Sequence, residues 1–407
     1  MTGRIRILLK VMTSAALTLT CAAACAAQTP AERSRDAVLK SASLTADELS
    51  AVERGEAVVK LLPLTDKREV AFCGVTRLRG EPAALLAAFE GSLTRSNNRV
   101  ILGGGRLSAP PSPEDLQSLW LDTRDVDEMK RCAAGDCDLK LSAAMIERLR
   151  TDVDWGVPDN GLRATRLYRQ MLSDYARDYL ARGDEALIEY EGSAGDSSPA
   201  EGQRALLDSL PYVGDYAPEF AAYLRSFPRA ELPGVENTLH WSKIKFGFRP
   251  VLIVSHTATY TRARGGDAQI LVATKQLYAN HYLDSSLSLT LLLSAPAAGG
   301  ASDTYLLYVN RSRADVLDGL LAGVKRRVIE SQVTEGLRAI LRQTELSVET
   351  RPVNQADSDA RAREDASSSD LRTPLLRVVG YVSLALSLVA GLLLLWLRRR
   401  DLKARGA

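Results

Sequence analysis

Histidine is scarce in this chain, which has 407 residues and only three histidines, His240, His256 and His281. The sequence contains no H-E-x-x-H metalloprotease motif and no C-x-x-C-H haem-attachment motif. Gly103-Gly104-Gly105 is not followed by Gly-Lys-Ser or Gly-Lys-Thr, which excludes a phosphate-binding loop there. Gly192-Ser193-Ala194-Gly195 lacks the spacing of a hydrolase nucleophile elbow. No nucleophile–base–acid set can be named, so the sequence favours a non-enzymatic role but leaves enzymatic activity open, and we expect no cofactor.

A large excess of one charge is also lacking. The formal net charge of +2 consists of +3 in residues 1–27, +4 in residues 398–407 and −5 in the residues between them. An acidic body without a basic stripe argues against nucleic-acid binding. With 46% hydrophobic and 25% charged residues, the chain has a globular composition, which excludes collagen-like, disordered and disulfide-scaffold classes.

Residues 1–27 have the order of a secretory signal peptide. Three basic residues precede an apolar stretch that starts at Val11, and small residues follow near Cys25. We expect cleavage after Ala27. Lipidation of Cys25 and an uncleaved N-terminal anchor are the alternatives.

Residues 378–397 form an uncharged run of 20 residues. A helix of this length rises about 30 Å, which matches the hydrocarbon core of a bilayer. Three arginines follow directly, and positive residues stay on the cytoplasmic side. We therefore expect a single-pass type I protein with a cytoplasmic basic tail at 398–407, lying against anionic lipids. Residues 349–373 have almost no apolar side chains and are expected to be a flexible linker.

The exported body is then residues 32–348. Only 11 of the 52 basic residues are lysines, a bias that suits a GC-rich bacterial genome. This places the protein in the bacterial inner (cell) membrane, with its body in the periplasm or outside the cell.

Three cysteines remain after signal removal. Cys132 and Cys137 flank a short loop in which Gly135 permits a turn, so a disulfide between them is the main prediction for an oxidising compartment. Free thiols are an alternative. A metal pair is the other, but no further Cys or His follows within 100 residues. Cys73 lies in an apolar, strand-like run and is expected to be a buried, inert thiol.

The body begins with two strand-like runs, 57–64 and 68–78, and a helix at 81–89. Helix-start signals then recur through residues 108–230, which predict an all-helical insertion. Within it a stripe of side chains repeats at helical spacing, which is typical of a core face. The stripe consists of Tyr168, Met171, Leu172, Tyr175 and Tyr179.

Four β-rich runs follow Pro233, and their short connections favour antiparallel hairpins. Four leucines alternate with polar residues between Leu287 and Leu293, so one face of that strand is strongly apolar. Ser312 then reads as the cap of a long helix at 312–346, which we expect to cover the open face of the sheet. The predicted fold class is therefore α+β: a curved antiparallel sheet packed on a long C-terminal helix, with an all-helical insertion and a C-terminal transmembrane helix.

The element order over 55–90 and 238–348 is similar to that of the START-like helix-grip fold. This resemblance implies an apolar cavity between the curved sheet and the last helix. Three segments, MKRCAAGDCDLKLSAAMIERLR, ATKQLYANHYLDSSLSLT and YLLYVNRSRADVLDGL, also resemble a group of uncharacterised exported bacterial proteins, for which no established activity supplies catalytic residues.

His256 and His281 share strand parity with apolar neighbours, which is more typical of hydrogen-bonded core residues than of ligand contacts. As candidate ligand-binding residues in such a cavity we name His256, His281, Tyr260 and Tyr278. His240 is interpreted as structural.

The main functional hypothesis is a membrane-tethered periplasmic domain that binds a lipid or other hydrophobic ligand. The first alternative is an envelope scaffold that docks a partner protein through the tyrosine-rich helices. The second is an uncharacterised hydrolase that uses His256 or His281.

Overall fold

The computed structural model describes residues 39, 42–97, 101–191, 198–246, 249–264, 267–296, 302–317 and 322–349. The predicted signal peptide, transmembrane helix and basic tail, and nearly all of the predicted linker, lie outside these residues. Within them, no helix is both long and apolar enough to cross a membrane.

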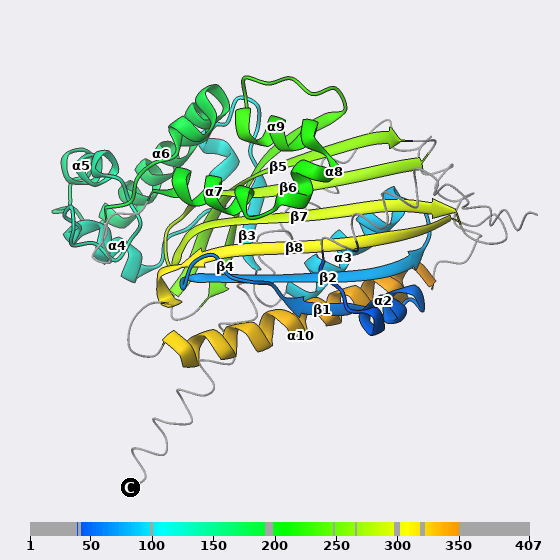
Figure 1. Ribbon diagram of the computed structural model, residues 1–407. Coiled ribbons are helices and arrows are strands. Elements are labelled where there is room, and N and C mark those ends of the chain that lie inside the picture. Colours follow the sequence, from blue (N-terminus) through cyan, green and yellow to red (C-terminus); the bar gives the residue numbers. More distant parts are fainter. Residues whose placement is uncertain are drawn as a thin grey trace, which may run out of the picture.

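A curved, fully antiparallel sheet of eight strands is the centre of the fold (Figure 1), with the strand order β1-β2-β8-β7-β6-β5-β4-β3. Consecutive strands from β3 to β8 are neighbours, and β1 and β2 complete the sheet beside β8. The predicted α+β class with a curved antiparallel sheet is thus confirmed. The strands are β1 (Val58–Leu61), β2 (Glu69–Arg79), β3 (Ile101–Arg106), β4 (Val235–Phe246), β5 (Arg249–Arg264), β6 (Asp267–Ala279), β7 (Leu283–Pro296) and β8 (Ser302–Ala314).

Strand β3 was not predicted from the sequence. Gly103-Gly104-Gly105, which the sequence excluded as a phosphate-binding loop, lies in β3, and Gly105 pairs with Trp241 of β4. A Cβ atom at Gly105 would lie 3.1 Å from Trp241 Nε1, so glycine is needed there for the indole to pack closely. The need for glycine at this position comes from tertiary packing and could not be predicted locally, because glycine on its own disfavours strands.

Helices cover both faces of the sheet. We call the first face the α10 face; α3 (Pro82–Asn97) and α10 (Ala322–Glu349) pack on it and against each other. At the β2 end of this face the packing is tight, because a Cβ atom at Gly74 would lie 2.7 Å from Leu337 Cδ2. We call the second face the insertion face. It is covered by α2 (Ala46–Glu53) and by helices that come between β3 and β4 in the chain.

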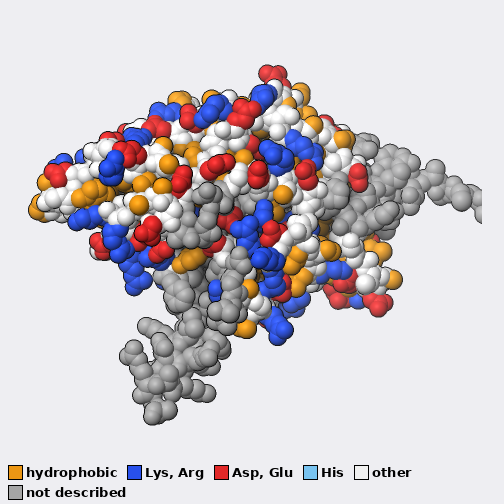
Figure 2. Space-filling view, turned by 60° about the vertical axis from the view of Figure 1, so that its left-hand side comes forward, with side chains coloured by type: hydrophobic (Ala, Val, Ile, Leu, Met, Phe, Trp, Pro, Cys, Tyr) orange, Lys and Arg blue, Asp and Glu red, His pale blue; other side chains and the backbone are white. Residues whose placement is uncertain are grey.

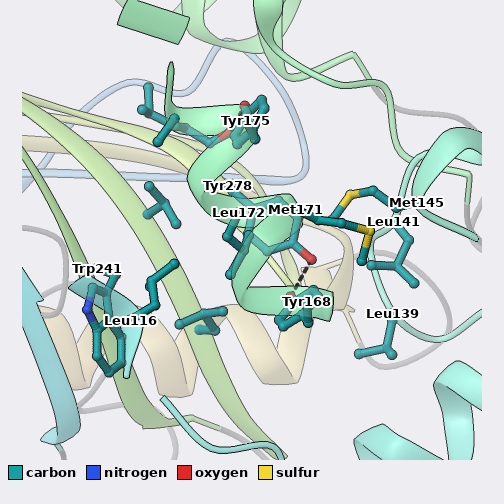
Figure 3. Close-up of a cluster of buried hydrophobic side chains, with 14 of the residues drawn as sticks. Leu116, Leu139, Leu141, Met145, Tyr168, Met171, Leu172, Tyr175, Trp241 and Tyr278 are labelled. Carbon is teal, nitrogen blue, oxygen red and sulfur yellow. Dashed lines mark hydrogen bonds between the residues drawn. The ribbon is translucent and has the colours of Figure 1, made fainter. Parts of the chain in front are cut away.

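The predicted helical insertion is confirmed between β3 and β4. It comprises η1 (Pro113–Leu116), α4 (Thr123–Arg131), α5 (Ala143–Asp152), α6 (Asn160–Arg182), η2 (Gly183–Ala186), α7 (Pro199–Asp208), α8 (Pro211–Tyr216) and α9 (Pro218–Ser226). The tyrosine stripe of α6 is a core face, as its spacing predicts: it is buried against Trp241 and Tyr278 of the sheet (Figure 3). A scaffold function could not use this stripe as a docking surface.

The prediction of a helix capped by Ser312 is wrong. Strand β8 continues to Ala314, a short turn η3 (Asp315–Leu317) follows, and α10 begins at Ala322. Ser312 lies in the sheet, where its hydroxyl is 2.8 Å from Ser286 Oγ.

The sequence did not predict which layer covers the apolar face of β7. The alternating leucines face the insertion, whereas α10 covers the opposite face. The sequence could not separate the two cases because both faces of β7 are buried. The leucines concerned are Leu287, Leu289, Leu291 and Leu293.

The contact between α7 and β7 gives a test of this packing. A Cβ atom at Gly202 would lie 2.6 Å from Ser285 Oγ and 3.0 Å from Ser285 Cβ. We expect Gly202→Ala to lower the free energy of unfolding by about 1–3 kcal/mol in urea denaturation, because the helix must move away from the strand. The matched control is Gly214→Ala in α8, where no atom lies within 4 Å of the added Cβ. Equal losses in both variants would contradict the close contact.

Candidate functional site

The four candidate residues named from the sequence all lie on the insertion face or at its edge, not beneath α10. His256 and Tyr260 lie on β5, Tyr278 lies on β6, and His281 lies in the β6–β7 turn. None of them lines the interface between the sheet and α10, because α10 packs on the other face. The prediction that these four residues line a cavity between the sheet and the C-terminal helix is therefore wrong.

His256 joins the sheet to α6. Its Nε2 lies 2.8 Å from Asn237 Oδ1, which is only an acceptor, so Nε2 donates this hydrogen bond. Nδ1 then accepts from the hydroxyl of Tyr179, also at 2.8 Å. Burial, with a smaller contribution from the charge of Lys275, lowers the pKa of His256 to about 3, so the ring is neutral.

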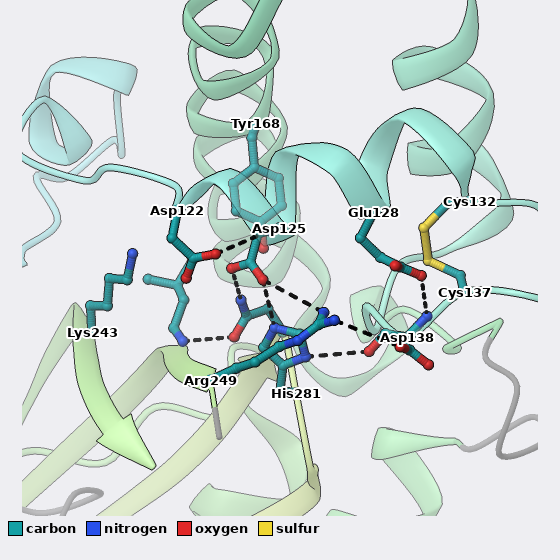
Figure 4. A network of polar contacts seen from close by, with 12 residues as sticks. Asp122, Asp125, Glu128, Cys132, Cys137, Asp138, Tyr168, Lys243, Arg249 and His281 are labelled. Atoms are coloured by element: carbon teal, nitrogen blue, oxygen red, sulfur yellow. Dashed lines mark hydrogen bonds and ion pairs between the residues drawn. A yellow bond between two sulfur atoms is a disulfide. The ribbon is translucent and has the colours of Figure 1, made fainter. Parts of the chain in front are cut away.

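His281 holds the first helix of the insertion, α4, onto the sheet (Figure 4). Its Nε2 is 3.0 Å from Oδ1 of Asp125, a carboxylate with no exposed surface. Its Nδ1 lies 3.3 Å from the backbone oxygen of Asp138. Asn280 Nδ2 donates to the second oxygen of Asp125 at 3.4 Å. Both ring nitrogens of His281 thus contact acceptors that position the insertion, and neither contacts a nucleophile.

The disulfide between Cys132 and Cys137 is formed, with the Cα atoms 4.7 Å apart. It closes the loop that presents Asp138 to His281, and Glu128 accepts a 2.9 Å hydrogen bond from the backbone nitrogen of Asp138. Ligand atoms of Glu128 and the two cysteines lie within 4.8 Å of one another. In the disulfide form the sulfurs are bonded to each other and are not thiolate ligands.

The two tyrosines also hold the helical layer. The hydroxyl of Tyr278 is 2.7 Å from that of Tyr168 on α6, and burial raises the pKa of Tyr278 well above its usual value. The ring of Tyr260 is stacked on Phe220 of α9, with the ring centroids 5.5 Å apart. All four residues named from the sequence are therefore anchors of the insertion.

The α10 face carries a different cluster, which we call the unpaired row. It consists of His240 on β4, Ser255 on β5 and Gln276 on β6, which are cross-strand neighbours. Each residue is only 1% exposed. Among the residues that the structure describes, no hydrogen-bond partner exists for Nδ1 or Nε2 of His240, Oγ of Ser255 or Oε1 of Gln276.

Elsewhere among the described residues, Thr290 Oγ1 of β7 and Gln332 Oε1 of α10 also lack partners. Other polar side chains on the same face are paired, such as Thr257 with Thr274 at 2.9 Å. Buried polar groups are hydrogen-bonded in the great majority of cases, and each unpaired one costs about 1–3 kcal/mol. Adjacent unpaired atoms of this kind can be satisfied by bound water or by a ligand.

The chemistry of the unpaired row is neutral. Burial lowers the pKa of His240 to about 3, so its ring has one donor and one acceptor nitrogen. Ser255 can donate or accept, and the free oxygen of Gln276 accepts. The apolar core of this face includes Ile253, which lies two residues before Ser255 on β5. The row therefore suits an uncharged hydroxyl, carbonyl or amide.

Sequence reasoning missed the unpaired row. It assigned His240 a structural role and did not single out Ser255 or Gln276. The available signal was polar residues at alternating positions of strands whose other face is apolar, as in β5 and β6. That signal resembles a solvated face and becomes informative only once the face is known to be buried.

Comparisons with known proteins return no matching family model, curated protein or solved structure. The resemblance to the helix-grip fold therefore depends on the order of the elements.

The depressed histidine pKa values predict how stability depends on pH. His256 binds a proton below about pH 6.5 in the unfolded chain but only below about pH 3 in the folded protein. Its stabilising contribution is present above pH 6.5 and is lost as the pH falls through this window. We expect the loss of unfolding free energy between pH 7 and pH 5 to be about 2 kcal/mol smaller in His256→Gln than in wild type. Urea denaturation at both pH values measures this, and identical pH dependence in the two proteins would contradict it.

Proposed function

We propose that this chain is an exported, membrane-tethered and non-catalytic domain that binds a hydrophobic ligand with an uncharged polar group. The ligand lies on the α10 face over strands β4 to β6, beside α3. The observation that carries the proposal is the unpaired row of His240, Ser255 and Gln276, whose polar atoms are buried without partners.

The position over β4 to β6 follows from how the rest of this face is filled. At the β2 end, Leu337 and Leu341 of α10 already contact the backbone at Gly74, which leaves no space for a ligand. The unpaired row lies on strands at the other end of the sheet. A ligand there places its polar group on the row and its apolar part against the core side chains of the same face.

The uncharged character of the polar group follows from the absence of charge in the row. A charged headgroup buried against a neutral imidazole, a hydroxyl and an amide would lack a counter-ion and would pay a large desolvation cost. The desolvation cost of a hydroxyl, ester or amide is much smaller, and such a group satisfies several unpaired atoms at once. This favours a neutral lipid or a similar molecule over an anionic phospholipid.

The membrane tether brings such a ligand within reach. Helix α10 ends at Glu349, where the predicted linker to the segment 378–397 begins. A body held by a linker of about 25 residues remains within roughly 30 Å of the bilayer surface. The tether therefore supports an exchange of hydrophobic molecules with the membrane.

The proposal is tested by extracting small molecules from purified full-length protein and identifying them by mass spectrometry. We expect a neutral hydrophobic compound that is enriched at least tenfold in wild type over Gln276→Leu, because the leucine removes the acceptor from the row. Extracts of the two proteins with the same composition would contradict the proposal.

Stability measurements on two neighbouring hydroxyls provide a matched control. Ser255 and Thr257 lie on the same strand and the same face, but only Thr257 has a partner. In protein stripped of small molecules, Ser255→Ala should leave the unfolding free energy unchanged or raise it, since an unpaired group is removed. Thr257→Val should lower it by about 1–3 kcal/mol, because Thr274 loses its partner. Equal losses would show that the Ser255 hydroxyl is already paired.

A further inference from the structure

A cleft with a volume of about 660 Å³ opens on the insertion face, on the opposite side of the sheet from the unpaired row. Its walls are η2, α7 and the segment that follows α9, and its floor is β6. This volume lies within the range of small-molecule sites. The cleft shares no residue with the unpaired row, so it can be considered independently of the proposed function.

The side chains that line the cleft carry more positive than negative charge. On the side of the molecule drawn in Figure 2, basic and acidic side chains are interspersed. Among the described residues that line the cleft, by contrast, five are cationic and three are anionic: Arg182, Arg204, Arg225, Arg229 and Lys275 against Asp184, Glu185 and Glu189. This excess is notable in a body whose sequence is acidic overall.

Arg204 and Lys275 differ from the other cations of the cleft. Arg204 is exposed on α7 and takes part in none of the ion pairs found among the described residues. Lys275 is only 7% exposed, and its ammonium lies 2.7 Å from Asp184 Oδ1. An ammonium has three donors, so Lys275 keeps further donors for a ligand at the floor of the cleft.

Gln203, which also lines the cleft, supplies an acceptor. Its Nε2 donates to the backbone oxygens of Gln276, at 2.7 Å, and Ser286, at 3.1 Å. These two bonds fix the orientation of the amide, because its oxygen cannot bond a carbonyl. Oε1 of Gln203 has no partner within the described part of the chain, and the residue is 2% exposed. A small void of about 10 Å³ beside it connects Gln203 and Lys275 to His256.

We propose that the cleft binds a small carboxylate that also carries a hydrogen-bond donor, such as a hydroxy acid or an amino acid. The carboxylate lies between Lys275 and Arg204, two cations of the lining, of which Lys275 is paired with the partly exposed Asp184. The hydroxyl or amino group of the ligand donates to Oε1 of Gln203. Charge selects an anion, and the unpaired oxygen selects a donor next to it.

The test is isothermal titration calorimetry of full-length protein with lactate and with propionate. These two acids differ by the hydroxyl group. We expect lactate to bind, and to bind at least fivefold more tightly than propionate. Two results would overturn the proposal. One is the absence of lactate binding at about millimolar protein and up to a 50-fold excess of lactate, and the other is equal affinity for the two acids.

Variants locate the binding. Arg204→Gln should weaken lactate binding at least tenfold, and so should the double variant Lys275→Gln/Asp184→Asn, which keeps a neutral hydrogen-bonded pair on the floor. Arg163→Gln is the charge-matched control, because Arg163 pairs with Asp159 at the start of α6, outside the cleft. Equal weakening by Arg163→Gln would reduce the effect to overall charge and overturn the site. Ser255→Ala should leave lactate binding unchanged, which separates this site from the unpaired row.

Discussion

Burial of the sheet on both faces is the constraint on which the rest of this structure depends. Leu292 and its neighbours Leu291 and Leu293 are all at most 2% exposed, although they point to opposite sides of β7. A polar side chain on any central strand therefore cannot turn to water and must find a partner in the protein. Most do, as the buried pair of Glu69 and Arg311 does. Others have no partner among the described residues, such as Ser285 on the insertion face and the unpaired row on the α10 face.

The same constraint explains how the insertion is held. Asp125 has no exposed surface, and a carboxylate at such a position is stable only with hydrogen-bonding partners. His281 and Asn280, from one turn of the sheet, supply them. The disulfide between Cys132 and Cys137 closes the loop next to this contact. The insertion is thus fastened to the sheet by polar contacts at one end and by the tyrosine face of α6 along its length.

Strands β5 and β6 serve both proposed sites. Ser255 and Gln276 point to the α10 face, whereas the adjacent His256 and Lys275 point to the insertion face, because side chains alternate along a strand. Gln203 in the cleft bonds the backbone oxygen of Gln276. A ligand on one face therefore acts on the strands that carry the groups for the other face, with only the thickness of the sheet between them.

The sequence by itself determined the α+β class, the antiparallel meander and the helical insertion, because periodicity, capping residues and short connections are local properties. It also favoured a disulfide between Cys132 and Cys137. It also assigned the tyrosine stripe to a core. Only the tertiary structure decided which face of the sheet each strand residue occupies, since both faces are buried and alternation cannot tell them apart. This is why the sequence placed His256 and Tyr260 under the last helix and passed over Ser255 and Gln276. Whether a buried polar atom is paired depends on residues far away in the chain, and no local pattern records it.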